Sequence, residues 1–315
     1  MLDALPLLLP LAGAPFPWAG EVAAALSALF WGSAHIVFAR IHPPISAVAL
    51  NLGKNVFAAV FFIAALWIHT GSPIPQGLDT EALVIFAASG FLGLAVCDTL
   101  LMRSLLDLGP QRMTLLFLTV PVLVSLAATL PPLSESQPLG AWAGMLVCIG
   151  GIGMAIRRRT EDEADPARFR RGVRTGLLAA LFQTVAILLA RHGLANEDAP
   201  LLDSAVVRMA AGTIGVMVFG LFTRRLARWS AEVRRPDAFW MLAAASFVGT
   251  FLGIYANQVG LKWSAHAGVA TTLNSLMPIY LLPLSVLFLR ERFGAREIIA
   301  TFVAVGGVAL MFLAS

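Results

Sequence analysis

Three charged side chains stand deep inside long apolar stretches of the sequence, where a charge is costly. Lys54 and Arg208 are about 10–14 Å below the membrane surface if each stretch is a helix that crosses a bilayer and rises ~1.5 Å per residue. A cation at the centre of a bilayer costs about 2.5–3.5 kcal/mol, so each of them requires a partner. Asp98 matches the depth of Lys54, and we expect these two to pair. Such a pair can belong to a substrate site, or it can only hold two helices in register.

The segment FWGSAHIVFAR, residues 30–40, adds polar side chains to another apolar stretch. In lipid, Ser33 and His35 must face a partner or a water-filled cavity. They can line a substrate path, or they can hydrogen-bond within their own helix and to a neighbouring one. Trp31 lies about one turn from His35 and offers an aromatic wall for a substrate, or an anchor at the interface.

The second half of the chain places uncharged polar groups in the motifs YANQ and TTLNS. Asn257, Thr271 and Asn274 supply hydrogen-bond donors and acceptors that suit a small zwitterion or an amide. The alternative is that these side chains join helices by hydrogen bonds. The candidate substrate-binding set is therefore Trp31, Ser33, His35, Lys54, Asp98, Arg208, Tyr255, Asn257, Thr271 and Asn274.

Motifs for hydrolysis or for ATP use are missing from the sequence. It contains no HExxH, no nucleophile elbow and no P-loop. Cys97 and Cys148 stand alone in separate apolar stretches, as expected of small packing residues. We therefore expect no cofactor, no metal and no enzymatic activity. Two rivals remain open: a membrane-embedded enzyme that uses His35 and Asp98 as acid and base, and a sensor or scaffold that does not transport.

The elements that must position these residues are membrane helices. The 315-residue chain is 58% hydrophobic and 13% charged, which is typical of a polytopic membrane protein. Its basic residues form short clusters between apolar runs, which argues against a nucleic-acid partner. We predict an all-α fold with ten spans, at 22–40, 45–68, 82–105, 112–131, 138–156, 173–190, 201–223, 238–261, 266–289 and 295–314.

The spans divide into two similar halves. We interpret residues 1–21 as an interfacial lead, 22–156 as the first five-helix repeat, 157–172 as a polar linker and 173–315 as the second repeat. Pro121 aligns with Pro278, CIGGIG with AVGGVA, and Asp98 with Tyr255 at the depth of Arg208. Because five is odd, two such halves must be inverted relative to each other. GAWAG and GTFLG are small-residue motifs that predict close helix packing.

Lysine and arginine indicate the orientation. The odd-numbered connections hold eighteen basic residues, and the even-numbered ones with both termini hold two. Because short basic loops stay in the cytoplasm, this count places the odd connections inside and both termini outside.

These patterns together resemble one known family, the EamA-type transporters of the drug/metabolite transporter superfamily. The motifs are LFWGSAHIVFAR in the first span and a basic residue in the second and seventh spans. The fourth and ninth spans each contain a proline and have a glutamate at the helix end, and the fifth and tenth contain GG. The resemblance implies ten helices as two inverted repeats around a central cavity, in a monomeric exporter of amino acids or similar amphiphiles in the bacterial inner membrane. Members of the family are usually drawn with both termini in the cytoplasm, whereas the arginine count of this chain places both termini outside.

Two further expectations concern the partners of such a transporter. Lys54 and Arg208 leave a phosphorylated or anionic metabolite or lipid open as an alternative substrate. Asp98 is the acid predicted deepest within a span, and it could couple transport to protons. The expected partners are thus a small-molecule substrate, the lipid bilayer and protons.

Overall fold

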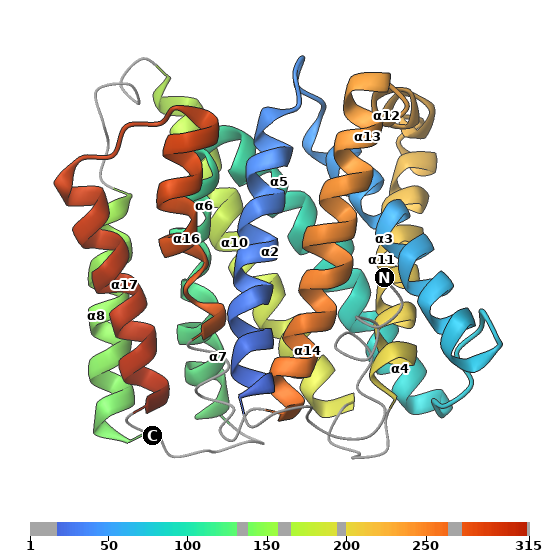
Figure 1. Ribbon diagram of the computed structural model, residues 1–315, viewed down its shortest axis with the longest axis horizontal. Helices are drawn as coiled ribbons and strands as arrows, with labels where there is room; N and C mark the ends of the chain where they lie inside the picture. The colour runs from blue at the N-terminus through green and yellow to red at the C-terminus, as the bar shows by residue number, and fades with distance from the viewer. Residues whose placement is uncertain (1–17, 131–137, 157–164, 194–199, 264–272, 314–315) are drawn as a thin grey trace.

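The computed structural model describes residues 18–130, 138–156, 165–193, 200–263 and 273–313, and all regular structure within these ranges is helical (Figure 1). Thr271 lies outside them. The first half contains α2 (Ala19–Arg40), α3 (Ala47–Thr70), α4 (Thr80–Gly90), η2 (Phe91–Cys97), α5 (Asp98–Leu108), α6 (Pro110–Phe117), α7 (Thr119–Ala128) and α8 (Leu139–Ala155). The second contains α10 (Pro166–Gly193), α11 (Leu201–Phe222), α12 (Leu226–Val233), α13 (Pro236–Ala245), η3 (Ser246–Leu252), α14 (Gly253–Trp263), α16 (Met277–Leu284), η4 (Ser285–Leu289) and α17 (Ala295–Leu313).

Most of the helices are long and apolar enough to cross a membrane. Within the described ranges eight helical segments meet that requirement, and two apolar segments, Leu139–Ala155 and Met277–Leu289, are shorter. Except for the short α12, the long axes of the helices run roughly parallel in one bundle (Figure 1). The chain is thus a multi-pass membrane protein built from helices, in agreement with the sequence.

The first helix of the second half starts earlier than predicted. The sequence suggests a polar linker up to residue 172, but α10 begins at Pro166. Asp165 caps this end, because its Oδ1 accepts a hydrogen bond from the backbone N–H of Arg168 at 2.9 Å. Proline at the first helical position is favoured because its missing N–H has no partner there in any case.

Several membrane helices are interrupted. The helices η2, η3 and η4 are π-helices inside longer helical segments, and the break between α6 and α7 falls at Leu118, three residues before Pro121. Proline lacks the N–H that would bond the carbonyl one turn earlier, which accounts for a break at this place.

The small-residue motifs lie at helix contacts, as predicted. On α8, a side chain at Gly144 would reach to within 2.6 Å of the Gly307 carbonyl oxygen of α17, and one at Gly151 would collide with the backbone of Ala304. On the other side of the bundle, a side chain at Gly253 would meet the indole of Trp31 at 2.7 Å. These positions need glycine because the neighbouring helix occupies the space.

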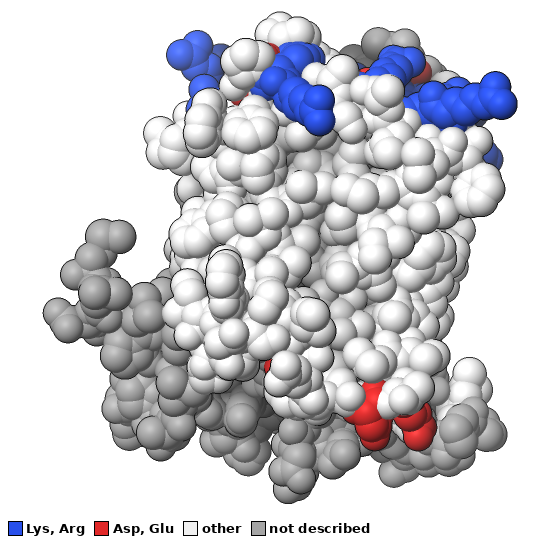
Figure 2. Space-filling view, turned by 90° about the vertical axis from the view of Figure 1, so that its right-hand side faces the viewer, with Lys and Arg blue, Asp and Glu red and all other residues white. Residues whose placement is uncertain are grey.

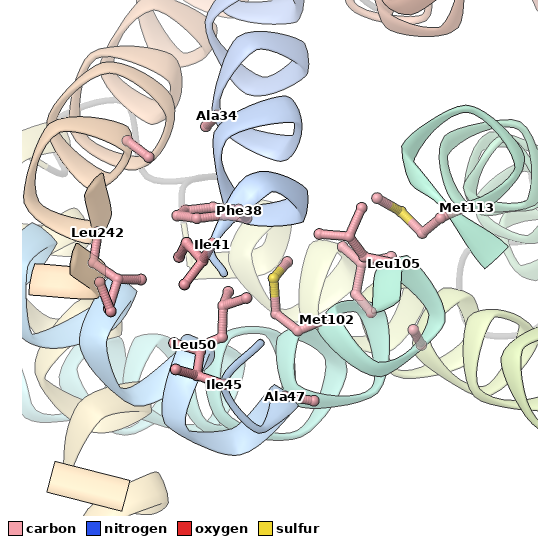
Figure 3. Close-up of a cluster of buried hydrophobic side chains, with 14 of the residues drawn as sticks. Ala34, Phe38, Ile41, Ile45, Ala47, Leu50, Met102, Leu105, Met113 and Leu242 are labelled. Atoms are coloured by element: carbon pink, nitrogen blue, oxygen red, sulfur yellow. The ribbon is translucent and has the colours of Figure 1, made fainter. Parts of the chain in front are cut away.

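One end of the bundle is basic and closed by apolar side chains. Figure 2 shows lysine and arginine gathered at one end and acidic residues near the other. Directly below the basic end, Phe38 of α2, Leu50 of α3, Met102 of α5 and Leu242 of α13 point toward one another (Figure 3). We call this buried group, which also includes Ile41, Ile45, Leu105 and Met113, the basic-end core.

Candidate functional site

A polar face on α3 forms the centre of the site. Asn51, Lys54 and Asn55 are spaced i, i+3 and i+4, which puts them on one side of a helix. All three are buried, although the remainder of α3 is almost entirely apolar. Sequence analysis singled out Lys54 and missed both asparagines. The pattern NLGKN inside a span, with two amides flanking a cation on one helical face, is the signal that could have found them.

The two asparagines compensate for an irregular backbone on the facing helix. The side-chain amide of Asn51 donates to the Leu94 carbonyl at 2.8 Å, and that of Asn55 donates to the same oxygen at 2.9 Å. Leu94 belongs to η2, and a π-helix disturbs the regular pattern of main-chain hydrogen bonds. Asn51 also donates to Thr99 Oγ1 at 2.9 Å. The amides therefore hold η2 against α3 and satisfy a buried main-chain carbonyl.

Lys54 and Asp98 form the ion pair predicted from the sequence. Lys54 Nζ lies 2.7 Å from Asp98 Oδ2 and donates a second hydrogen bond to Asn55 Oδ1 at 2.9 Å. The side chains of Lys54 and Asp98 are 6% and 17% exposed. Asp98 is the first residue of α5, directly after the π-helix, so η2 sets the direction in which its carboxylate points.

Arg208 stands beside this pair but is not neutralised by it. Its Nε is buried without a hydrogen-bond partner among the described residues. Asp98, already bound to Lys54, is the acid whose charge acts on Arg208. Lys54, Arg208 and Asp98 together carry an excess of one positive charge. A cation held at membrane depth without a partner is a strong indication of an anionic ligand.

His35 of α2 completes this region. Its Nδ1 is buried and has no hydrogen-bond partner in the described part of the chain. The charge of Lys54 acts on the His35 ring, which places the two in the same electrostatic environment. The ring contacts Phe38 of the basic-end core, with 6.4 Å between ring centroids. Ser33 is half-buried on the same helix.

A second polar group joins three segments from both halves. Ser27 of α2 donates a hydrogen bond to the side-chain oxygen of Asn274, and Asn274 donates to the side-chain oxygen of Asn257 on α14. The sequence predicted Asn257 and Asn274 but not Ser27, because a serine in a membrane helix usually bonds its own backbone. The Ser27 Oγ also lies 2.9 Å from the Ala24 carbonyl, so its single hydrogen is shared between the two acceptors. Tyr255 is half-buried and lies two residues before Asn257 on α14.

The helix order revises the counterpart of Asp98 in the second half. The segments α4, η2 and α5 have 11, 7 and 11 residues, and α13, η3 and α14 have 10, 7 and 11. Aligning the π-helices pairs Asp98 with Gly253, two residues before the predicted counterpart, Tyr255. The sequence alignment had no way to register a π-helix. Where Asp98 presents a carboxylate, Gly253 leaves room for the Trp31 indole.

The described residues form no evident metal site. No cluster of three or more histidine, cysteine, aspartate or glutamate side chains was found there. Cys97 and Cys148 are free and buried, and both belong to apolar clusters.

Comparison with known proteins identifies the family. The sequence model of the EamA-like transporter family matches the chain twice, over residues 18–157 and 170–313. The chain belongs to the EamA-like transporter family. This confirms the resemblance to the drug/metabolite transporter superfamily, whose EamA members are transporters and not enzymes. The two matches also show that the chain contains two EamA repeats.

Other comparisons add information on the fold alone. A search of curated proteins found no match. Among solved structures, one titled "Crystal structure of protein" is similar with a TM-score of 0.69 and 17% sequence identity, over 95% of this EamA chain and 98% of that chain. At this identity the likeness supports the same helical architecture, and its title names no substrate.

Proposed function

We propose that the protein is a secondary transporter that moves small metabolites by alternating access between two inverted five-helix halves. The observation that carries this proposal is the polar group formed by Lys54, Asp98 and Arg208, which is buried at membrane depth and receives side chains from both EamA repeats. Secondary transporters built from repeats bind their substrates near the bilayer midplane between the repeats. Family membership supports transport as the activity, and the buried polar group supports this position for the substrate site.

Ten spans in two inverted repeats account for the helix pattern. Leu139–Ala155 and Met277–Leu289 are shorter than the other apolar segments. We count them as the fifth and ninth spans, because the EamA model matches both halves of the chain. The similar lengths of α4–η2–α5 and α13–η3–α14 support the repeat. With five spans a half, the second repeat enters the membrane from the opposite side.

Alternating access needs one end closed while the other is accessible. The basic-end core fills the bundle directly below the basic end (Figure 3). If this end faces the cytoplasm, as the positive-inside rule predicts, the conformation described here is closed to the cytoplasm. Separation of α2 from α5 and α13 would break this core and open the inner side.

An amino acid or a similar amphiphile is the proposed substrate, and export is the proposed direction. Asn257 and Asn274 offer amide groups to a zwitterion, and Trp31 offers an aromatic surface. We place the protein in the bacterial inner membrane as a monomer. The rival enzyme mechanism is disfavoured because the Asp98 carboxylate is already bound to Lys54.

An anionic metabolite is the second candidate, and Arg208 favours it. Lys54 has two acceptors, whereas the buried Nε of Arg208 has none among the described residues. A carboxylate or phosphate on the substrate would neutralise the excess positive charge.

Exchange assays in liposomes test both candidates. Purified protein is reconstituted with a panel of zwitterionic amino acids, carboxylates and phosphorylated compounds, and exchange is compared with that of empty liposomes. We expect exchange of at least one class. Arg208→Gln should reduce it at least tenfold, whereas Arg225→Gln, which removes an exposed arginine, should not. If the folded protein exchanges no compound, the transporter proposal fails. If Arg208→Gln exchanges as well as the wild type, Arg208 has no role in binding.

A further inference from the structure

A cavity of about 490 Å³ opens on the basic end of the molecule, outside the polar group described above. Its walls come from the α2–α3 connection, the end of α5, the start of α10 and α12. Ile45 lines this cavity and also belongs to the basic-end core, so apolar side chains separate it from Lys54 and Asp98. The volume is within the range of small-ligand pockets, roughly 300–1,000 Å³.

One wall of the cavity holds more arginine than acid. The Asp107 side chain is 4% exposed. Its carboxylate accepts hydrogen bonds from Nε and Nη2 of Arg171, at 2.8 and 2.9 Å, and from Nε of Arg103 at 3.0 Å. Arg168 lies 3.7 Å from the same carboxylate and donates to the Leu106 carbonyl at 2.6 Å. Three guanidinium groups thus share a single carboxylate. Asp107, Arg103 and Arg168 all line the cavity, and the Asp107 side chain is largely buried among the arginines.

The wall formed by α12 holds one acid and one arginine. Glu232 of α12 accepts a hydrogen bond from the backbone N–H of Ser46 at 2.7 Å, at the N-terminus of α3, and pairs with Arg228 Nε at 3.2 Å. One oxygen of the Glu232 carboxylate is therefore already occupied by the N-terminus of α3. The Arg228 side chain is 76% exposed and lines the cavity together with Glu232.

The cavity therefore combines cations on two walls with an apolar surface. Three arginines line it, Arg103, Arg168 and Arg228, together with two acids, Asp107 and Glu232, which leaves an excess of one positive charge. Pro44, Ile45 and Leu106 supply apolar surface between the walls. Guanidinium groups with free nitrogens match the oxygens of a phosphate, and basic pockets on the cytoplasmic side of membrane proteins suit anionic headgroups.

We propose that this cavity binds a phosphate group, and that Arg168 and Arg228 hold it from opposite walls. The group can come from the headgroup of an anionic phospholipid or from a free phosphate ester. In both cases bound phosphate links α10 to α12, two elements that are distant in sequence, and stabilises the basic end of the bundle.

Thermal unfolding of the full chain in an uncharged detergent tests the site. The probes are short-chain phosphatidylglycerol, short-chain phosphatidylcholine as a zwitterionic lipid, and glycerol 3-phosphate. Phosphatidylglycerol should raise the melting temperature of the wild type by several degrees, and phosphatidylcholine should not. Arg168→Gln combined with Arg228→Gln should abolish the shift. Arg234→Gln is the matched control, because it removes an exposed arginine one residue beyond α12 that does not line the cavity.

The pattern of shifts identifies the source of the phosphate. A shift with both phosphatidylglycerol and glycerol 3-phosphate means that the phosphate alone suffices. A shift with phosphatidylglycerol alone assigns the site to a lipid. If the double variant responds like the wild type, or if no probe shifts the wild type, the proposal is wrong. If the double variant does not fold, Arg228→Gln alone is tested, because Arg228 is the most exposed of these side chains. It should reduce the shift.

Discussion

The ion pair between Lys54 and Asp98 is the residue-scale feature with the largest expected effect on stability. Removing one partner of a buried pair leaves an uncompensated charge, at a cost of about 3–5 kcal/mol. We therefore predict that Asp98→Asn lowers the melting temperature substantially, because Lys54 stays buried at 2.7 Å from a neutral amide. Lys54→Met added to Asp98→Asn should recover most of the loss. Additive losses in the double variant, measured by thermal unfolding, would contradict this coupling.

Sequence reasoning located this pair because a charge in a membrane helix restricts its possible partners. Depth along two helices was enough to match Lys54 with Asp98. It could not assign a partner to Arg208, for which the described residues offer none. Asn51, Asn55 and Ser27 were missed for another reason: each compensates for a local backbone or side-chain arrangement that exists only after the helices have packed.

At the scale of elements, the contact between α8 and α17 gives a matched test of glycine packing. Gly150 and Gly151 are neighbours on α8, but a side chain at Gly150 meets nothing within 4 Å, whereas one at Gly151 collides with the backbone of Ala304. Alanine is favoured over glycine in a helix by about 1 kcal/mol. Gly150→Ala should therefore keep or raise the melting temperature, and Gly151→Ala should lower it. Equal effects would mean that α8 and α17 do not pack as described.

The helices themselves were largely predictable, and their irregularities were not. Apolar length indicated the spans, and the break between α6 and α7 lies close to Pro121. The π-helices have no comparable sequence signal, because an inserted residue changes the hydrogen-bond register without changing hydropathy. The start of α10 was missed because Pro166 was interpreted as part of a polar linker and not as the first residue of a capped helix.

For the whole molecule, orientation in the membrane follows from the asymmetric charge in Figure 2. Arg225 lies at the basic end, and Gln76 lies in the α3–α4 connection at the opposite end. In intact cells an impermeant maleimide should label Gln76→Cys but not Arg225→Cys, which should react after permeabilisation. Cys97 and Cys148 are buried and should give little background. The reverse labelling would place the termini in the cytoplasm, where the family usually has them.

Proton coupling is also a property of the whole transport cycle. If α3 and α5 separate in one state, Asp98 loses its cation and can take up a proton there. Exchange by the wild type in liposomes should then respond to an imposed pH gradient. The double variant Lys54→Met and Asp98→Asn, which removes both charges, should lose this response. If the pH gradient does not change exchange by the wild type, transport is not coupled to protons and the protein moves its substrate only downhill.

The shortness of α8 has a consequence for the surrounding lipid. The 17 residues of α8 rise about 26 Å, whereas the hydrocarbon core of a typical bilayer is about 30 Å thick. α8 lies at one edge of the bundle, so acyl chains beside it must shorten, tilt or disorder (Figure 1). This hydrophobic mismatch makes one flank of the protein a locally thinned patch of membrane. Lipids with shorter or unsaturated chains should gather there, which gives the bundle a preferred bilayer thickness.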